Sequence, residues 1–456
     1  MRRSLFITAV LWLAWGTTAS GQYPPGEHFS PNVHLISHVP LGGAGTVMDI
    51  ELEQELSRPF AYVSRSDYGR PAIGRAMGFD VIDLKDPAKA HVIRRWRIEN
   101  LDLHQGLGGM AGKYFKLKGR YYYVQSFQFR GSGPDLDLGD IVFDVTSLPD
   151  TTGMKEVGRI RPPNLPGGTH NLFAYKHSDG RTLLFITVEA TPAYPYGAHV
   201  YDMEKFLAGA PDQGFIGGIP LPEPRGANRG YHDAYVAYDP INHRDVFYGG
   251  GPEVSPLGGN FVYDVTDLKN PKLLATIIAQ SSMQSGGHTF VATPDGRYGM
   301  TIMTSLAHQP VRFWDLKPAL DGTTPVIKMP IGEWTVAPTK SSHMIEIRWP
   351  YAFIADYEQG LRVLDIRNPT DPMQVGFYDT YNYRTPYGVG TEAAGAFGLD
   401  VRNADGLIVV PDMQSGFWAF RMDGFDGWNG HDWGMPNASS VQDWDNGPDG
   451  APKKIT

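Results

Sequence analysis

The stretch Gly360-Leu-Arg-Val-Leu-Asp-Ile-Arg-Asn-Pro369 decides the fold, because versions of this phrase recur along the chain. Most copies are a short apolar run that ends in Asp, and the others lie at 79–87, 141–146, 199–203, 261–271, 311–318 and, degraded, 416–422. Successive copies are 61, 58, 62, 51, 50 and 56 residues apart, measured at Asp83, Asp144, Asp202, Asp264, Asp315, Asp365 and Arg421. Such an interval has room for four short strands and their turns. The repeat therefore predicts an all-β chain folded as a seven-bladed β-propeller.

The two ends of the repeat predict how the ring closes. Residues 32–40 have the pattern of an outer strand without a blade before it, whereas the last blade, from about 395 to 422, has three candidate strands. We expect the N-terminal strand to join the last blade, which would remove the exposed strand edges. The expected organisation is a signal peptide at 1–21, one propeller domain at 30–425 and an irregular C-terminal tail at 426–456.

The composition agrees with a turn-rich β protein. Charged residues make up 20% of the chain and aromatic residues 12%, with 54 Gly and 36 Pro, which is a balance typical of all-β folds. Cysteine is absent. Its absence excludes disulfides, thiolate metal sites and a cysteine nucleophile.

The first residues have the layout of a secretory signal. Arg2 and Arg3 precede an apolar run from Leu5 to Trp15 and a group of small residues that ends at Gly21. We expect cleavage near Gly21 and a periplasmic or secreted protein, and the paired arginines leave open the export of a folded, metal-loaded chain. Removing both arginines changes the formal charge from −9 to −11, with 38 basic residues against 49 acidic ones. This acidity disfavours nucleic acid and anionic membranes as partners, and no later stretch has the roughly 20 apolar residues of a membrane helix, so we expect no membrane insertion.

The repeated phrase, with its apolar run, its Asp and its trailing Asn-Pro or Asp-Pro, resembles the repeat of the LVIVD-repeat proteins. The clearest copies are 79–87, 261–271 and 360–369, and the resemblance covers most of residues 30–425. That family is a set of exported bacterial β-propellers, so the resemblance implies the fold and export. It implies almost nothing about activity, because the function of such a ring depends on the sites placed on it.

Four histidines share one position in the repeat, at the start of successive inner strands. They are separated by 62, 56 and 55 residues, which is the blade repeat, and they are His170, His232, His288 and His343. The start of an inner strand faces the mouth of the central channel, so we expect the four imidazoles to lie on one arc. The matching points of the other blades, near Gly45, Gly109 and Ala396, have small residues that would leave one side open for a substrate.

A transition metal ion is the simplest group to bind between four such rings. Neutral imidazole nitrogens suit iron, copper, zinc and nickel, whereas calcium and magnesium prefer oxygen ligands. Four nitrogen ligands leave one or two positions for oxygen, water or substrate, which is a catalytic layout. We expect one metal ion, iron or copper before zinc or manganese, in an exported metal-dependent oxidoreductase. The arrangement resembles that of carotenoid-cleaving oxygenases in architecture only, and a metal-dependent lyase or hydrolase is the variant.

Further candidates lie in the loops on the same rim. His104 and His308 are candidate catalytic residues that would carry protons. The second N–H of a ligating histidine usually bonds a carboxylate or carbonyl, and the acids near the expected centre are Glu189, Glu253, Glu358, Glu346 and Asp233. Rim aromatics predict a small-molecule substrate, aromatic or apolar, and they are Tyr68, Phe127, Phe129, Tyr194, Tyr196, Tyr231, Tyr381, Tyr383 and Tyr387. Arginines that would bind a carboxylate are Arg130, Arg225 and Arg229.

Three other interpretations remain open at the level of sequence. The four histidines could bond within their own blades, as in repeats of the WD type, and Gly287-His288 followed by Trp314-Asp315 fits that pattern. They could also line a polar channel without metal. In a different class of function, the ring would be a non-catalytic module that binds a partner at the cell surface through its rim.

Overall fold

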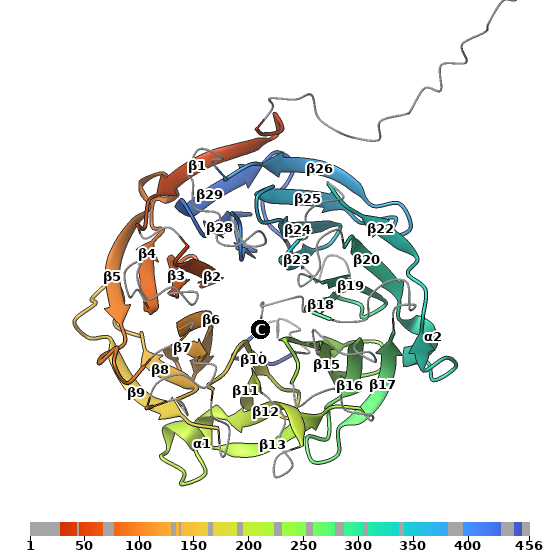
Figure 1. Ribbon diagram of the computed structural model, residues 1–456, viewed down its shortest axis with the longest axis horizontal. Helices are drawn as coiled ribbons and strands as arrows, with labels where there is room; N and C mark the ends of the chain where they lie inside the picture. Colours follow the sequence, from red (N-terminus) through yellow and green to blue (C-terminus); the bar gives the residue numbers. More distant parts are fainter. Residues whose placement is uncertain are drawn as a thin grey trace, which may run out of the picture.

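Seven sheets, antiparallel except for one added strand in blade 4, are arranged radially round a central axis in the computed structural model (Figure 1). The structure describes residues 28–42, 45–66, 77–104, 106, 108–128, 134–135, 138–162, 167–188, 195–222, 230–251, 259–278, 287–303, 309–336, 342–381, 395–429 and 442–448. The predicted signal peptide at 1–21 lies outside these residues. No helix in the described parts of the chain has the length and apolar character needed to cross a bilayer.

In blades 1 to 6 the first strand in the chain is the innermost strand of the sheet. Blade 1 consists of β2 (Val47–Leu52), β3 (Phe60–Arg65), β4 (Gly78–Asp83) and β5 (His91–Arg97), with the short helix η1 (Pro87–Lys89) between the last two. Blade 2 consists of β6 (Gly108–Leu117), β7 (Arg120–Gln128), β8 (Asp140–Asp144) and β9 (Lys155–Ile160). Blade 3 consists of β10 (Leu172–Lys176), β11 (Thr182–Thr187), β12 (Tyr196–Asp202) and β13 (Phe215–Pro220), with α1 (Met203–Leu207) before β13.

The remaining blades repeat the plan with two departures. Blade 4 consists of β14 (Asp233–Asp239), β15 (Arg244–Gly250), β16 (Asn260–Asp264) and β17 (Lys272–Ile277), and β21 (Val326–Ile327) pairs with β17 in parallel. Blade 5 consists of β18 (Thr289–Ala292), β19 (Tyr298–Ile302), β20 (Val311–Asp315) and the short outer strand β22 (Gly332–Trp334), with α2 (Lys317–Leu320) in between. Blade 6 consists of β23 (Met344–Arg348), β24 (Tyr351–Ala355), β25 (Leu361–Asp365) and β26 (Met373–Tyr378).

Blade 7 closes the ring as the sequence predicts. It consists of β27 (Asp400–Val401), β28 (Ile408–Asp412), β29 (Gly416–Met422) and the N-terminal strand β1 (Val33–Val39). The outer pair runs antiparallel, with Val33 opposite Met422 and Val39 opposite Phe417. The prediction of a seven-bladed propeller closed by its N-terminal strand is therefore confirmed.

The recurring phrase has a local physical cause. Its Asp ends the third strand, and one carboxylate oxygen accepts the backbone N–H two residues later, as Asp264 does from Thr266 at 3.0 Å and Asp365 from Arg367 at 3.0 Å. Asp side chains favour this turn because the bond satisfies a backbone donor where the strand stops. The same bond is made by Asp83, Asp144, Asp202 and Asp315.

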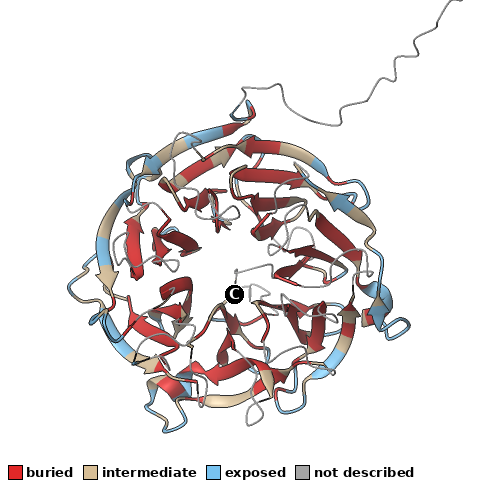
Figure 2. Ribbon diagram, in the orientation of Figure 1, coloured by how far each residue is buried: buried red, intermediate tan, exposed pale blue. Residues whose placement is uncertain are grey.

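The apolar run before each Asp is continuous because both faces of an inner sheet are buried. In β25, Leu361 and Val363 pack in the cluster shared with blade 7, whereas Leu364 faces the cluster shared with blades 3 to 5. Successive side chains of a strand point to opposite faces. Figure 2 shows the result, with buried inner strands and with exposed residues on the outer strands and the turns at the periphery.

Parts of the C-terminal tail pack against the ends of the inner strands. Trp428 donates its indole N–H to the carbonyl of Trp349, 2.7 Å away, at the end of β23. Further along, Trp444 is buried against Phe115 at the end of β6. These inner strands start at the histidine end of the channel, so the described parts of the tail lie at its opposite end.

Candidate metal centre

The four predicted histidines stand immediately before the inner strands of blades 3 to 6. The backbone N–H of each donates to the second strand of the same blade, and these bonds join His170 to Thr187, His232 to Gly250, His288 to Ile302 and His343 to Ala355. Glycines let the chain approach the preceding blade closely at these points. A Cβ on Gly230 would collide with the carbonyl of Val188.

The structure brings the four rings together on one arc. The ring centroids of His170 and His232 are 4.0 Å apart, those of His232 and His288 are 3.7 Å apart, and those of His288 and His343 are 4.7 Å apart. Rings from four different blades are therefore in direct contact, as the repeat spacing predicts.

Each of the four rings is held through its Nδ1 atom. Nδ1 of His170 lies 2.8 Å from Gln128 Oε1, and Nδ1 of His343 lies 2.6 Å from the carbonyl of Phe397. Nδ1 of His232 lies 3.0 Å from Asp233 Oδ1, and Nδ1 of His288 lies 2.9 Å from the hydroxyl of the next residue, Thr289. Acceptors at Nδ1 favour the tautomer with the proton there, which leaves a lone pair on Nε2 for a metal.

Asp233 connects two of the rings. Besides His232, its carboxylate accepts from Asn171 at 2.7 Å and from Thr289 at 2.6 Å, and Oδ2 lies 3.5 Å from Nδ1 of His288. Burial alone would raise the pKa of this carboxyl, but the neighbouring His288 and His232 and the hydrogen bonds lower it well below its usual value. Asp233 is thus an ionised group that orients two candidate ligands.

The rings at the far end of the arc are neutral. Burial lowers the pKa of His288 well below its ordinary value, with the adjacent histidines adding to the effect. Burial also lowers the pKa of His343 to about 4. Neutral imidazole is the form that binds a metal, so these two rings need lose no proton first.

The donor atoms fit a metal site in composition. Among the described residues, ligand atoms of His170, His232 and Asp233 all lie within 4.8 Å of one another, and this group does not include His288 or His343. Because both oxygens of Asp233 already accept hydrogen bonds, the carboxylate fits the role of an orienting partner better than that of a ligand. Nitrogen donors without thiolate suit iron, copper or zinc.

A group of apolar side chains, called the apolar wall below, lies beside His343 at one end of the arc. It is a separate buried cluster made of Met48, Met110, Tyr357, Phe397 and Met413. Two of its rings contact His343, with centroid distances of 3.8 Å to Phe397 and 5.1 Å to Tyr357.

The small residues at the matching points of the other blades have bulky neighbours. A Cβ on Gly109 would meet the carbonyls of Arg65 and Gly78 in the neighbouring blade, so this glycine serves packing between blades. The bulky neighbours Met110 and Phe397 contribute to the wall instead. No sequence signal marks these residues, because a methionine near the start of an inner strand has the pattern of an ordinary core residue.

Several other candidate residues lie elsewhere in the fold or outside the described residues. His104 is buried between the carbonyl of Glu99 and the carboxylate of Asp135, with one ring nitrogen 2.7 Å from each. Phe127 and Tyr231 belong to the cores between blades and do not line the rim. Residues that lie outside the described parts are His308, Glu189, Glu253, Tyr68, Phe129, Tyr194, Tyr383, Tyr387, Arg130, Arg225 and Arg229.

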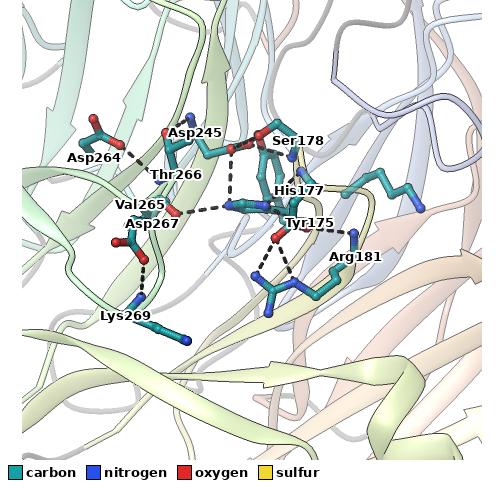
Figure 3. A network of polar contacts seen from close by, with 12 residues as sticks. Tyr175, His177, Ser178, Arg181, Asp245, Asp264, Val265, Thr266, Asp267 and Lys269 are labelled. Carbon is teal, nitrogen blue, oxygen red and sulfur yellow. Dashed lines mark hydrogen bonds and ion pairs between the residues drawn. The ribbon is translucent and has the colours of Figure 1, made fainter.

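His177 shows what a structural histidine looks like in this protein (Figure 3). It is fully buried, its Nε2 lies 3.1 Å from the carbonyl of Val265, and its Nδ1 accepts the backbone N–H of Asp179. Asp245 beside it also accepts from the hydroxyls of Tyr175 and Ser178, so the network ties a turn of blade 3 to blade 4.

His288 does not follow the WD pattern. Its ring packs between His232 and His343 of the adjacent blades. Trp314 bonds elsewhere, and its indole N–H donates to Thr301 at 2.8 Å.

Comparisons with known proteins agree with the fold. Residues 343–380 match the family model of the LVIVD repeat, and this match begins at His343. No curated protein matches the chain. A solved structure described as "Structure of U3-55K" is similar, with 7% identity, a TM-score of 0.51, and coverage of 86% of this chain and 98% of that chain. At that identity the likeness concerns the fold alone.

Proposed function

We propose that this LVIVD-repeat β-propeller is an exported metal-dependent enzyme, an oxidoreductase, whose centre is held by His170, His232, His288 and His343. The observation that carries the proposal is the contact between four rings from four blades, each held through Nδ1. Iron or copper is the preferred metal, and zinc or manganese would favour a lyase or hydrolase instead. A bound metal would supply Lewis acidity or electron transfer at the open coordination positions.

The chain contributes orientation and exclusion of water to this chemistry. Asp233 fixes the rings of His232 and His288, and the carbonyl of Phe397 fixes His343. The apolar wall of methionines and aromatic rings packs against His343 and supports an apolar or aromatic small molecule as the substrate.

Elemental analysis of the natively purified protein tests the proposal. We expect about one iron or copper ion per chain, lost in His232→Ala and kept in His34→Ala, a matched control because His34 is an exposed histidine of β1. Protein without metal, and with the same stability in both variants, would instead support the non-catalytic ring that binds a partner at the cell surface. The N-terminus of the mature chain, read by mass spectrometry after expression with its own leader, tests export.

A further inference from the structure

A second group of ionisable side chains lies in the same channel, beyond the histidine arc. The innermost strands of blades 1, 2, 6 and 7 contribute four carboxyls and two bases, and these are Asp49, Glu51, Lys113, Glu346, Arg348 and Asp400. All except Lys113 are nine-tenths or more buried. We call these six residues the pore cluster.

Contacts in the pore cluster cross from blade to blade. Lys113 Nζ lies 2.7 Å from Glu51 Oε2, which joins blade 2 to blade 1. Asp400 of blade 7 accepts the backbone N–H of Leu52 in blade 1 at 2.8 Å. Arg348 of blade 6 lies 2.8 Å from Glu346 and 3.6 Å from Asp400. These contacts form two groups, and the charges of Lys113 and Asp400 couple both groups and Asp49 electrostatically.

The pore cluster has more acids than bases, and burial makes this imbalance costly. A buried carboxyl that lacks its own cation keeps its proton in preference to ionising. Burial raises the pKa of Glu51 to about 8, with Asp400 adding to the effect and Lys113 opposing it. Burial likewise raises the pKa of Glu346 to about 7 and that of Asp49 to about 6. At neutral pH the pore cluster therefore holds protons inside the channel.

The pore cluster lies within electrostatic reach of the histidine arc. Glu346 is three residues after His343 on β23, about 10 Å along an extended strand. Asp49 is within reach as well, because the charge of Asp233, which holds two of the rings, acts on its carboxyl. At about 10 Å, with an effective dielectric constant of about 20, a divalent cation lowers the pKa of a carboxyl by about two units.

We infer that the pore cluster is a proton-exchange site coupled to the metal centre, which releases protons when a cation binds to the four histidines and takes them back when it leaves. The step is an acid dissociation: the O–H bond of a carboxyl breaks, the carboxylate keeps the electron pair, and the proton passes to solvent. No electron is transferred. The inference rests on the proposed metal centre, and it places beside that centre a group of carboxyls that release and take up protons.

Calorimetric titration with Zn²⁺ tests this inference, because zinc is inert to redox chemistry. Titrations of the metal-free protein near neutral pH, in buffers of different ionisation enthalpy, count the protons released on binding. We expect the wild type to release about one proton more than the double variant Glu51→Gln and Glu346→Gln. Glu55→Gln is the matched control, since Glu55 is a partly exposed glutamate of the same blade outside the pore cluster, and it should release as many protons as the wild type.

The outcomes separate the two proposals. Zinc binding with equal proton counts in the wild type and the double variant would overturn the inference and leave the metal centre standing. Absence of zinc binding in the wild type would overturn both. Infrared spectra of the wild type cover the case of a variant that does not fold: the carbonyl band of protonated carboxyls should lose intensity when Zn²⁺ is added to the metal-free protein, and an unchanged band counts against the inference.

Discussion

A substitution of Asp140 tests how far burial raises the pKa of a carboxyl in this fold. It is the first residue of β8 and is fully buried, with Oδ1 accepting the hydroxyl of Thr169 at 3.0 Å. Its other oxygen, Oδ2, is buried and has no hydrogen-bond partner in the described parts of the chain. Burial raises the pKa of this carboxyl from 3.8 to about 8, against the smaller effect of the Thr169 hydroxyl. Asp140 is therefore neutral in the folded protein at neutral pH.

The raised pKa gives Asp140→Asn a stability effect that depends on pH. Between 3.8 and about 8 the unfolded chain has lost this proton while the folded chain keeps it, so rising pH favours unfolding by about 1.4 kcal/mol per unit. From about pH 5 to about pH 7.5 the wild type loses about 3 kcal/mol through this one group. An amide has the shape of the neutral carboxyl and does not ionise. The stability of the variant relative to the wild type should thus rise by about 3 kcal/mol over that range.

Urea unfolding of the metal-free proteins at the two pH values measures this change. Asp144→Asn is the matched control on the same strand, because the pKa of Asp144 is lowered by its bonds to Arg120 and Thr146 despite partial burial. Asp144 is ionised in both states above pH 5, so its substitution changes stability by the same amount at both pH values. A gap between Asp140→Asn and the wild type that stays constant with pH would refute the reasoning.

Two further predictions concern the histidine arc. Asp233→Asn should weaken metal binding about 10- to 100-fold, because the carboxylate orients two rings. Competition with a chelator measures the affinity. The control variant Asp239→Asn, at the far end of β14, should leave the affinity unchanged. The metal-free protein should lose stability as pH falls from 6.5 towards 4, because burial lowers the pKa of His343 to about 4 and that of His288 further, so the unfolded chain takes up protons that the folded chain does not. Thermal unfolding near pH 7 and pH 5 measures the loss, and an equal Tm at both would contradict it.

The fold could be predicted because its repeat is a local event. The bond from Asp264 to the N–H of Thr266 recurs at the end of six third strands, and one Asp at each place makes the period visible in the sequence. The outer part of blade 5 could not be predicted in this way. Its outer strand β22 has three residues and follows an insertion that contains α2 and a strand paired with blade 4. Such pairing depends on tertiary contacts that leave no local signal.

One part of the candidate site could also be predicted from the sequence, and another part could not. The histidine arc could be predicted because equal positions in a repeat become neighbours on the channel axis. The pore cluster could not, because Glu51 and Lys113, although 62 residues apart like His170 and His232, are different residue types, so no repeated residue marks their position before blades 1 and 2 pack together. The apolar wall could not be predicted either, because Met48 and Met413 come from opposite ends of the chain.

The surroundings of the four rings in the arc differ from those of the structural histidine His177. His177 has protein partners at both ring nitrogens, so its position is explained without a ligand. In the arc, Nδ1 of His232 and of His288 bonds within its own blade, whereas Nδ1 of His170 bonds Gln128 of blade 2 and Nδ1 of His343 bonds the carbonyl of Phe397 in blade 7. Burial disfavours a proton on His288 and His343. A metal ion binds neutral imidazoles of this kind, and it is therefore the ligand that we propose for the arc.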